Sequence, residues 1–291
     1  MRVTVSVPAT SANLGPGFDS FGLALDLCNE VTVESGAEPM VAWEGEGATE
    51  LPTDGSDMVS RTIASIASRM EIEPPAFALH GVNRIPLERG LGSSSAAAVA
   101  GVVAASALFD LGWEDDRTTV FAAAAEVEGH PDNAAPAVFG GFTVALPDGF
   151  VRRLEPHPDL RPVAIVPDLR LSTVEAREAL APEVSRADAV FNAAHAALVL
   201  EAITRDPGLL AVALRDRLHE DARLRLVPEV ADLMEDLRRV RVPVCVSGAG
   251  PTLLAFETDD GPDLRPVLES RPTWRVLRPG VRASGFEVAR A

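Results

Sequence analysis

The sequence predicts an α+β protein in two halves, and two observations support this fold class. Strand-like and helix-like segments alternate along the 291 residues without the strict βαβ repeat of a barrel. A glycine-serine run, Gly90–Ser95, leads directly into an apolar, alanine-rich segment at 96–108 that reads as a buried helix. A chain of this length forms one large domain or two of ordinary size. We expect an N-terminal domain at 1–153 and a C-terminal domain at 154–291, packed tightly together because no low-complexity linker separates them.

The spacing of apolar residues predicts the elements of the first half. Residues 3–7 alternate as in a half-buried strand, and a turn-rich segment follows at 8–18. Apolar alternation resumes at 21–33, and the polar, acidic segment 36–56 is typical of a hairpin and loop. The remaining expected elements are helices at 58–70, 96–108, 118–128 and from Pro131, with strands at 76–82 and 142–146.

The second half repeats the alternation in another form. It is expected to begin with a strand at 162–166, and two strands flank the glycine turn at 248–251. The expected helices are at 173–180, 185–203, 207–218, 229–240 and 263–270, and the expected strands after 166 are at 244–247, 253–257, 274–277 and 286–288.

The net charge excludes several classes of partner. The chain carries 43 acidic residues against 26 basic ones, all of them arginine, for a net charge of −17. Such a field repels nucleic acid and anionic membranes, so neither is expected as a partner. The acidic residues are spread over loops and helix faces. This composition resembles that of proteins from salt-accumulating halophiles, in which molar salt screens surface repulsion.

The apolar segments and cysteines indicate the compartment. No apolar run reaches 18 residues, and no basic segment followed by an apolar one marks a signal peptide. Cys28 and Cys245 lie far apart in apolar surroundings, which favours two buried free thiols over a disulfide or a metal site. We therefore expect a cytoplasmic protein.

The segment Pro86–Ala96 predicts a phosphate-binding loop. Glycines let the backbone approach an anion, and the helix that follows presents its first N–H groups and its positive dipole end. A simple turn with a helix cap is the alternative interpretation. A dinucleotide fingerprint is disfavoured because Ser95 stands where it needs a third glycine, and a Walker loop because the chain has no lysine.

Three segments together carry a family resemblance. In order they are 8–19 (PATSANLGPGFD), 86–98 (PLERGLGSSSAAA) and 246–252 (VSGAGPT). Their order and spacing resemble the three motifs of the GHMP small-molecule kinases. The first motif, together with 128–133 (EGHPDN), is most similar to the homoserine kinase branch. The resemblance implies a two-domain GHMP kinase fold, with the phosphate-binding loop in the N-terminal domain and an α/β sandwich-like C-terminal domain.

The resemblance also implies ATP and Mg²⁺ as cofactors. Ser94 is expected near the magnesium ion, together with a carboxylate for which Glu128 is favoured and Glu126 remains open. The residues implied in ATP binding are Pro86, Leu87, Glu88, Arg89, Gly90, Leu91, Gly92, Ser93, Ser94, Ser95, Ala96, Gly248 and Gly250.

For an amino-acid substrate, the resemblance implies residues that bind its carboxylate and residues that bind its ammonium group. Arg177 and Arg223 are expected to bind the carboxylate, and Asp19 the ammonium group, because these pairs suit bidentate and charge-assisted bonds. Asn13 and His130 are expected to complete the substrate site. Where mevalonate-type relatives have a catalytic aspartate, this chain has Asp132 and Asn133. Similarity to the homoserine kinase branch implies Asn133 in the catalytic centre, and whether a general base is used stays open.

The implied activity is the ATP-dependent phosphorylation of the side-chain hydroxyl of L-homoserine to O-phospho-L-homoserine, a step of threonine biosynthesis. One alternative is another GHMP kinase that acts on a small alcohol such as mevalonate or shikimate. Another is a catalytically dead paralogue that senses a metabolite. The small-molecule substrate is the expected partner, and a homodimer is left open.

Overall fold

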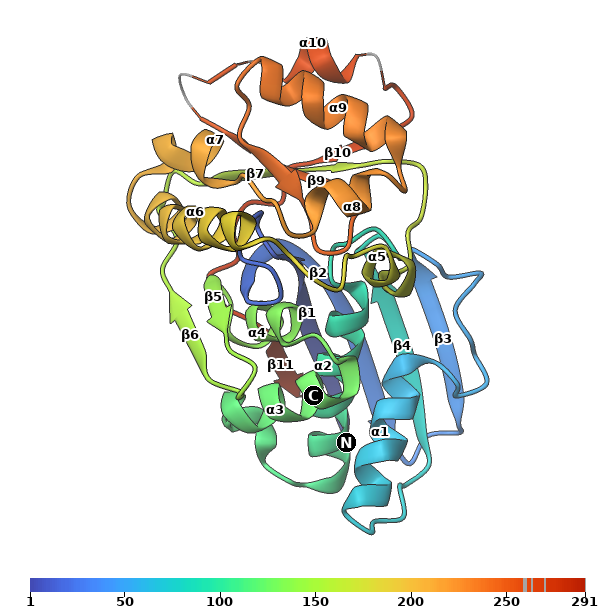
Figure 1. The fold of residues 1–291 in the computed structure, drawn as a ribbon. Helices are drawn as coiled ribbons and strands as arrows, with labels where there is room; N and C mark the ends of the chain where they lie inside the picture. The colour runs from blue at the N-terminus through green and yellow to red at the C-terminus, as the bar shows by residue number, and fades with distance from the viewer. Residues whose placement is uncertain (259–260, 263, 270, 291) are drawn as a thin grey trace.

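The structure is a computed structural model that describes residues 1–258, 261–262, 264–269 and 271–290, and it contains two β-sheets with helices packed on them (Figure 1). The predicted α+β class is confirmed. The first sheet has the strand order β11-β1-β2-β4-β3, with β5 paired to β2 and β6 paired to β5. Its strands are β1 (Arg2–Ala12), β2 (Phe21–Ser35), β3 (Met40–Gly45), β4 (Phe77–Asn83), β5 (Phe142–Ala145), β6 (Val151–Leu154) and β11 (Glu287–Arg290).

Strand β1 forms because every second side chain at 3–7 is apolar and points into the core. Val3, Val5 and Val7 are all fully buried, as the alternation at 3–7 predicts. The strand continues to Ala12, however, into the segment expected as turns. There Ala9–Ala12 pair antiparallel with Gly22–Leu25, after a register shift between Pro8 and Ala9. The start of the first motif is therefore held in the sheet, and only its later residues turn.

One expectation for this sheet is wrong, and one of its strands was not predicted. The acidic segment at 36–56 contains no hairpin, because β3 runs parallel to β4 and the chain crosses between them through α1. Strand β6 was not expected, and it forms a hairpin with β5. The sequence of β6, Val-Arg-Arg-Leu, has no apolar alternation, so no local signal marks it.

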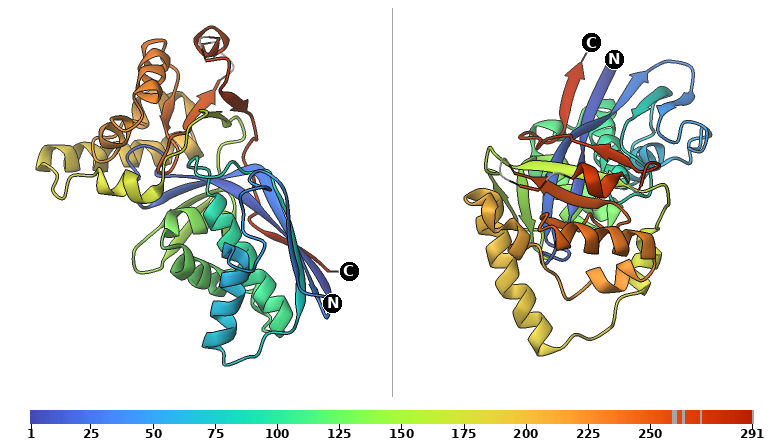
Figure 2. Two further views of the ribbon diagram at one scale, coloured as in Figure 1. Left: turned by 90° about the vertical axis from the view of Figure 1, so that its right-hand side faces the viewer. Right: turned by 90° about the horizontal axis from the view of Figure 1, so that it is seen from above.

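Four helices cover one face of the first sheet, as Figure 2 shows from the side. Helix α2 is the central one and is packed against α1, α3, α4 and β1, so it is apolar on nearly every side. Ser95 and Ser106 are fully buried within it. The helices on this face are α1 (Met58–Arg69), α2 (Ser93–Phe109), α3 (Arg117–Glu128) and α4 (Pro131–Phe139), with a short 3₁₀ turn, η1 (Trp113–Asp115), before α3.

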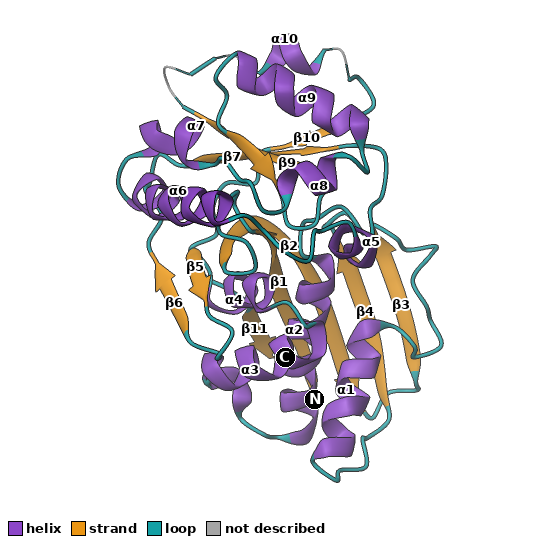
Figure 3. Cartoon of the chain, in the orientation of Figure 1, coloured by secondary structure: helices purple, strands orange, loops and turns teal. Residues whose placement is uncertain are grey.

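The strands of the second sheet lie apart from those of the first (Figure 3) and have the order β10-β7-β9-β8. This sheet has its own, smaller apolar core. Val163, Ile165 and Leu253 are fully buried in that core, against Val230 and Leu233 of α9. The elements of this half are β7 (Arg161–Val166), β8 (Val244–Val246), β9 (Leu253–Glu257), β10 (Arg275–Leu277), α5 (Thr173–Glu178), α6 (Arg186–Thr204), η2 (Pro207–Leu209), α7 (Leu210–Ala213), α8 (Glu220–Leu224), α9 (Pro228–Arg239) and α10 (Arg265–Leu268).

The helix expected at 207–218 is broken into shorter pieces, which is a further correction. After η2 and α7 the chain turns, and the Asp216 carboxylate accepts hydrogen bonds from the backbone N–H groups of Leu218, His219 and Glu220. These bonds satisfy the first donors of a new helix, α8. The ends of the helix expected at 263–270, Asp263 and Ser270, lie outside the described residues.

The last strand returns to the first sheet. Strand β11 pairs antiparallel with β1 over Val3–Ser6, and Figure 2 shows the two ends of the chain side by side. Each sheet is therefore built mainly from one half of the chain, but β11 belongs to the first. The domain boundary at 153 and 154 stays a prediction. Among the residues that the structure describes, no helix is both long and apolar enough to cross a bilayer.

Candidate active site

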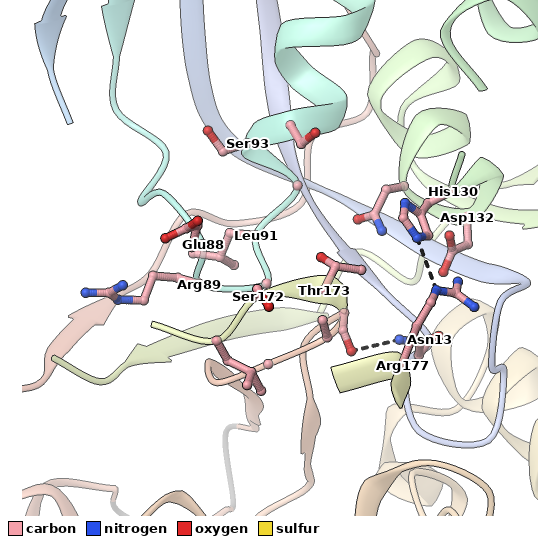
Figure 4. Close-up of a pocket in the computed structure, with 18 of the residues that line it drawn as sticks. Asn13, Glu88, Arg89, Leu91, Ser93, His130, Asp132, Ser172, Thr173 and Arg177 are labelled. Carbon is pink, nitrogen blue, oxygen red and sulfur yellow. Dashed lines mark hydrogen bonds between the residues drawn. The ribbon is translucent and has the colours of Figure 1, made fainter. Parts of the chain in front are cut away.

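A cavity of about 200 Å³ lies where the phosphate loop meets the first and third motifs, α5 and α8. It brings together most of the side chains that the sequence singled out, from six separate segments (Figure 4). The predicted residues that line it are Asn13, Asp19, Pro86, Glu88, Arg89, Gly90, Leu91, Gly92, Ser93, Ser94, Glu128, His130, Asn133, Arg177, Arg223, Gly248 and Gly250. Four predicted residues, Leu87, Ser95, Ala96 and Glu126, are not part of its lining.

The phosphate loop is shaped by two glycines in the left-handed region. Gly90 has φ = 74° and Gly92, the N-cap of α2, has φ = 69°. A Cβ atom at Gly90 would collide with the carbonyl oxygen of Ser247, and one at Gly92 with the Thr10 hydroxyl. No side chain caps the N-terminus of α2. Its first N–H groups therefore remain available to an anion in the cavity.

The third motif holds this loop against the first motif. The Ser247 hydroxyl donates to the carbonyl oxygen of Gly90 at 2.6 Å, and the Gly248 N–H donates to the carbonyl of Ala12 at 3.0 Å. The Asn13 amide in turn donates to the carbonyl oxygen of Gly248 at 2.8 Å (Figure 4). The first motif, the phosphate loop and the third motif, which lie far apart in the sequence, thus contact one another.

The first motif folds back on itself, so that both of its predicted substrate residues face the cavity. Asn13 has φ = 69° and Asp19 has φ = 53°, both in the left-handed region. The Asn13 Oδ1 atom accepts the backbone N–H of Asp19 at 3.0 Å. Asparagine and aspartate tolerate this conformation better than most residues do.

The two candidate carboxylates for magnesium lie in different places. Glu128 ends α3, and its side chain is 8% exposed and accepts from Nδ1 of His130 at 3.0 Å. Glu126 is 62% exposed and forms an ion pair with Arg69 at 2.6 Å, outside the cavity. The geometry therefore favours Glu128 as the carboxylate that faces the phosphate loop.

His130 connects Glu128 to the substrate end of the cavity. Its Nδ1 faces Glu128, and its Nε2 accepts a hydrogen bond from Nε of Arg177 at 3.2 Å. Only the neutral ring with its proton on Nδ1 makes both bonds. The hydrogen bond to Glu128 raises the pKa of His130, and burial and Arg177 oppose that shift.

Arg177 also binds Asp19 through two parallel bonds, of 3.1 and 2.8 Å. The two residues expected to bind opposite charges of a substrate are thus paired with each other here. This pairing neutralises both charges at the mouth of the site, where each side chain is 40% exposed.

Arg223 is the more buried of the two arginines, with 3% of the residue exposed. Its Nη1 atom donates to the carbonyl oxygen of Gly248 at 2.7 Å and to Nδ1 of His219 at 3.0 Å. Burial lowers its pKa to about 10, so the guanidinium stays charged at neutral pH. A buried cation next to the cavity favours an anionic group of a ligand.

Asp132 was not among the predicted site residues, although it belongs to the pair that aligns with the aspartate of mevalonate-type relatives. It lies in the first turn of α4, lines the cavity and is 3% exposed. Burial, followed by the charges of Asp19 and Glu128, raises its pKa to about 7. The predicted catalytic neighbour, Asn133, accepts a hydrogen bond from the Thr10 hydroxyl at 2.9 Å. The signal for Asp132 in the sequence was its place beside Asn133 in the segment 128–133.

Two further parts of the lining were also missed, the stretch 171–173 and Ala249 of the third motif. Ser172 and Thr173 line the cavity at the start of α5, and Ser172 forms a capping box with Glu175. The Ser-x-x-Glu pattern marks a helix start in the sequence but gives no sign of a site. Leu171 lies next to them and closes the same wall.

Comparisons with known proteins agree with this geometry. The signature described as the GHMP kinases N terminal domain matches residues 57–141. A homoserine kinase from Clavibacter michiganensis is 42% identical over 99% of this chain and 94% of its own length. The crystal structure of a homoserine kinase from Cytophaga hutchinsonii superposes with a TM-score of 0.85 at 26% identity, covering 99% of this chain and 97% of that one.

A putative homoserine kinase from Listeria monocytogenes is 34% identical and has a TM-score of 0.77, with 99% of both chains covered. None of these similarities supports the expectation of a halophilic source, which stays a prediction. The two-sheet fold, the motif-lined cavity and the full-length similarity agree with one another. The chain therefore belongs to the homoserine kinases, a branch of the ATP-using GHMP kinase family.

Proposed function

We propose that this protein transfers the γ-phosphoryl group of ATP to the side-chain hydroxyl of L-homoserine, giving O-phospho-L-homoserine for threonine biosynthesis. The observation that carries the proposal is one cavity with two chemically different ends. Gly90, Gly92 and Ser94 form an anion-binding end, and Arg177, Arg223 and Asp19 form an end with both signs of charge. Homoserine has an ammonium and a carboxylate at one end and a hydroxyl at the other, so it matches this arrangement.

At the anion-binding end, the N–H groups of the loop and of the first turn of α2 bind the phosphates of ATP. These groups are already fixed by the contacts of Gly90 and Gly92, so little reorganisation is needed when charge develops on the transferred group. The other residues predicted for ATP binding form the walls of this end or the packing beneath it.

The donors at this end fit Mg²⁺. The Glu128 carboxylate and the Ser94 hydroxyl both line the cavity, and both offer hard oxygen atoms. The described residues contain no group of three or more His, Cys, Asp or Glu side chains that could hold a metal ion. This agrees with an ion held by one carboxylate, one hydroxyl and the phosphates of the nucleotide. When bound, Mg²⁺ would neutralise charge on the phosphates.

At the other end, Arg223 and Arg177 bind the substrate carboxylate and Asp19 binds the ammonium, with Asn13 and His130 fixing their positions. Binding at both charges directs the hydroxyl toward the phosphate loop, which supplies much of the catalysis in phosphoryl transfer. Asn133 and Asp132 lie beside that path. Asp132, whose pKa burial raises to about 7, accepts the hydroxyl proton in this proposal, which its position in the cavity lining supports.

A turnover assay with a panel of alcohols tests the proposal. With ATP and Mg²⁺, homoserine should be phosphorylated with a far higher kcat/KM than mevalonate or shikimate, because neither of these carries an ammonium group for Asp19. Better turnover of mevalonate or shikimate would favour the alternative kinase. Binding of ATP without turnover of any alcohol would favour a sensing paralogue. A cytoplasmic location and a homodimer remain predictions of the same proposal.

A further inference from the structure

Arg223 donates two hydrogen bonds to the protein from one nitrogen atom, Nη1. A guanidinium has five N–H groups in a fixed fork. In Arg223 the two protein bonds, to Gly248 and to His219, both leave from Nη1. The buried Nε atom has no hydrogen-bond partner among the described residues. With Nη1 held by the protein, the edge formed by Nε and Nη2 remains for a ligand, and such an edge binds a carboxylate at two points.

The orientation of this edge depends on His219. Its ring is buried, with none of the side chain exposed, and it accepts the Nη1 bond of Arg223 at Nδ1. On the opposite side, Nε2 lies 2.9 Å from the carbonyl oxygen of Gly15, to which only a protonated nitrogen can donate. The two partners together require the neutral tautomer with its proton on Nε2. A proton on Nδ1 would face an N–H group of Arg223.

Phe18, Arg223 and Asp216 surround the ring of His219, and the nearer Asp216 carboxylate oxygen lies 3.7 Å from its Nε2. Phe18 stacks on it with ring centroids 5.2 Å apart, and the Arg223 guanidinium lies 5.4 Å above the same Phe18 ring. Asp216 accepts the backbone N–H of His219 at 2.8 Å and so fixes the start of α8. Burial lowers the pKa of His219 to about 4, in agreement with a ring that stays neutral.

We propose that His219 is a positioning residue for substrate recognition: by accepting from Nη1, it turns the Nε and Nη2 edge of Arg223 toward the substrate carboxylate. The inference rests on the proposed function, because the carboxylate is that of homoserine. It also explains why the first motif and α8 meet: Gly15 selects the tautomer of His219, and His219 then orients Arg223. His219 was not among the site residues predicted from the sequence.

Two variants separate this role from mere packing. Both His219→Gln and His219→Asn remove the ring and its stacking on Phe18. The Gln amide reaches the position of Nε2 and keeps the bond to Gly15. The Asn amide reaches the position of Nδ1 and keeps an acceptor for Arg223. Only the second variant retains the proposed orienting bond.

The readout is the preference for homoserine over 3-aminopropan-1-ol, which is homoserine without its carboxylate. In His219→Gln we expect the ratio of the two kcat/KM values to fall about 10-fold, the size expected for losing a hydrogen bond to a charged group. The fall should come mainly from the KM for homoserine. In His219→Asn the ratio should stay within about 3-fold of the unmodified protein, on the same scale. Glu220→Gln is the control, because Glu220 lies in the same helix, is 1% exposed and binds Arg238 instead of Arg223.

Several outcomes overturn the inference. An equal loss of preference in the Gln and Asn variants would mean that the ring only packs, and an unchanged ratio in His219→Gln would mean that Arg223 needs no orienting bond. A fall of the ratio in Glu220→Gln would assign the effect to α8 as a whole. Inactivity of the unmodified protein toward homoserine would overturn the proposed function and this inference together.

A measurement on the unmodified protein tests the geometry even if the variants do not fold. Nitrogen-15 spectra of the five histidine rings report which nitrogen carries the proton. We expect one ring to remain the neutral Nε2-protonated tautomer from pH 6 to 8 and to change its Nδ1 shift when homoserine binds. A ring protonated on Nδ1 at the position of His219 would contradict the proposal.

Discussion

Arg177 and Asp19, which are 158 residues apart in the sequence, form a two-point ion pair with distances of 3.1 and 2.8 Å. Each is expected to bind one charge of the substrate. The zwitterion of homoserine can replace both partners at once, its carboxylate on Arg177 and its ammonium on Asp19. The two charges of the pair balance each other, and a zwitterionic ligand bound to both residues preserves that balance.

The first prediction concerns this exchange. Arg177→Ala should raise the KM for homoserine by about 10-fold, because a hydrogen bond to the charged carboxylate is lost at a side chain that is 40% exposed. The dissociation constant for ATP, measured by calorimetry, should stay nearly unchanged. Arg205→Ala is the matched control, because Arg205 is the C-cap of α6, is 76% exposed and pairs with Glu201 of that helix. Homoserine use that survives Arg177→Ala would mean that the carboxylate binds elsewhere.

The second prediction distinguishes the two glutamates at the end of α3. Glu128→Gln should lower kcat about 100-fold and raise the Mg²⁺ concentration needed for half-maximal rate, since a charge that offsets phosphate repulsion is lost. Glu126→Gln should change kcat by less than about 2-fold, because its exposed ion pair with Arg69 contributes little. The opposite order of effects would assign the metal to Glu126. Ser94→Ala should resemble Glu128→Gln in its Mg²⁺ dependence.

The third prediction is a pH dependence of stability that comes from Asp132. Its pKa is about 7 in the folded protein and near 3.9 in the unfolded chain. The folded state therefore binds more protons in this interval, and its free energy of unfolding falls as the pH rises from about 4 to 7. Asp132→Asn removes this dependence and should stabilise the protein at pH 8, by at most about 4 kcal/mol.

Denaturant unfolding at a series of pH values measures this effect. Glu220, whose pKa burial also raises to about 7, contributes with the same sign, so the difference between the unmodified protein and Asp132→Asn isolates Asp132. Equal slopes in both proteins would contradict the raised pKa. If Asp132→Asn also lowers kcat more than Glu128→Gln does, with ATP binding intact, Asp132 is the proton acceptor in the reaction.

The fourth prediction concerns the close approach of the phosphate loop to the third motif. Gly90→Ala should destabilise the protein and weaken ATP binding, because its Cβ would meet the carbonyl oxygen of Ser247. Gly112→Ala is the control: Gly112 has φ = 68° but open space around its Cβ. Both variants lose about 1 kcal/mol to the left-handed conformation. Only Gly90→Ala should lose more than about 1 kcal/mol of stability and also raise the dissociation constant for ATP. Equal effects of the two variants would mean that the phosphate loop can shift to make room for the Cβ atom.

Much of the fold could be predicted because its signals are local. The signals for α1, α3 and α9 lie within a dozen residues: Asp57 caps α1, Asp116 caps α3, and Pro228 begins α9. The structure places these helices within one residue of the expected starts. The sequence predicts the phosphate loop in the same way, because its two glycines and the serines before α2 are a local signal for a turn at a helix start. Periodicity reports that one face is buried. It does not report which segment covers that face.

The features that could not be predicted depend on contacts between segments that are distant in the sequence. The parallel pairing of β3 with β4 and the hairpin of β6 with β5 follow from how the whole sheet assembles. The same holds in the site. Nothing near His219 in the sequence indicates that its ring lies between Gly15 and Arg223, and nothing near Asp132 indicates that burial beside Asp19 changes its pKa.

The return of β11 to the first sheet has a consequence for how the protein is made. Until residues 287–290 are synthesised, β1 has no neighbour on one side, and its N–H and C=O groups over Val3–Ser6 are open to other chains. That edge belongs to the same strand that leads into the first motif. The nascent enzyme therefore exposes an aggregation-prone edge for most of its synthesis, and only the last strand covers it.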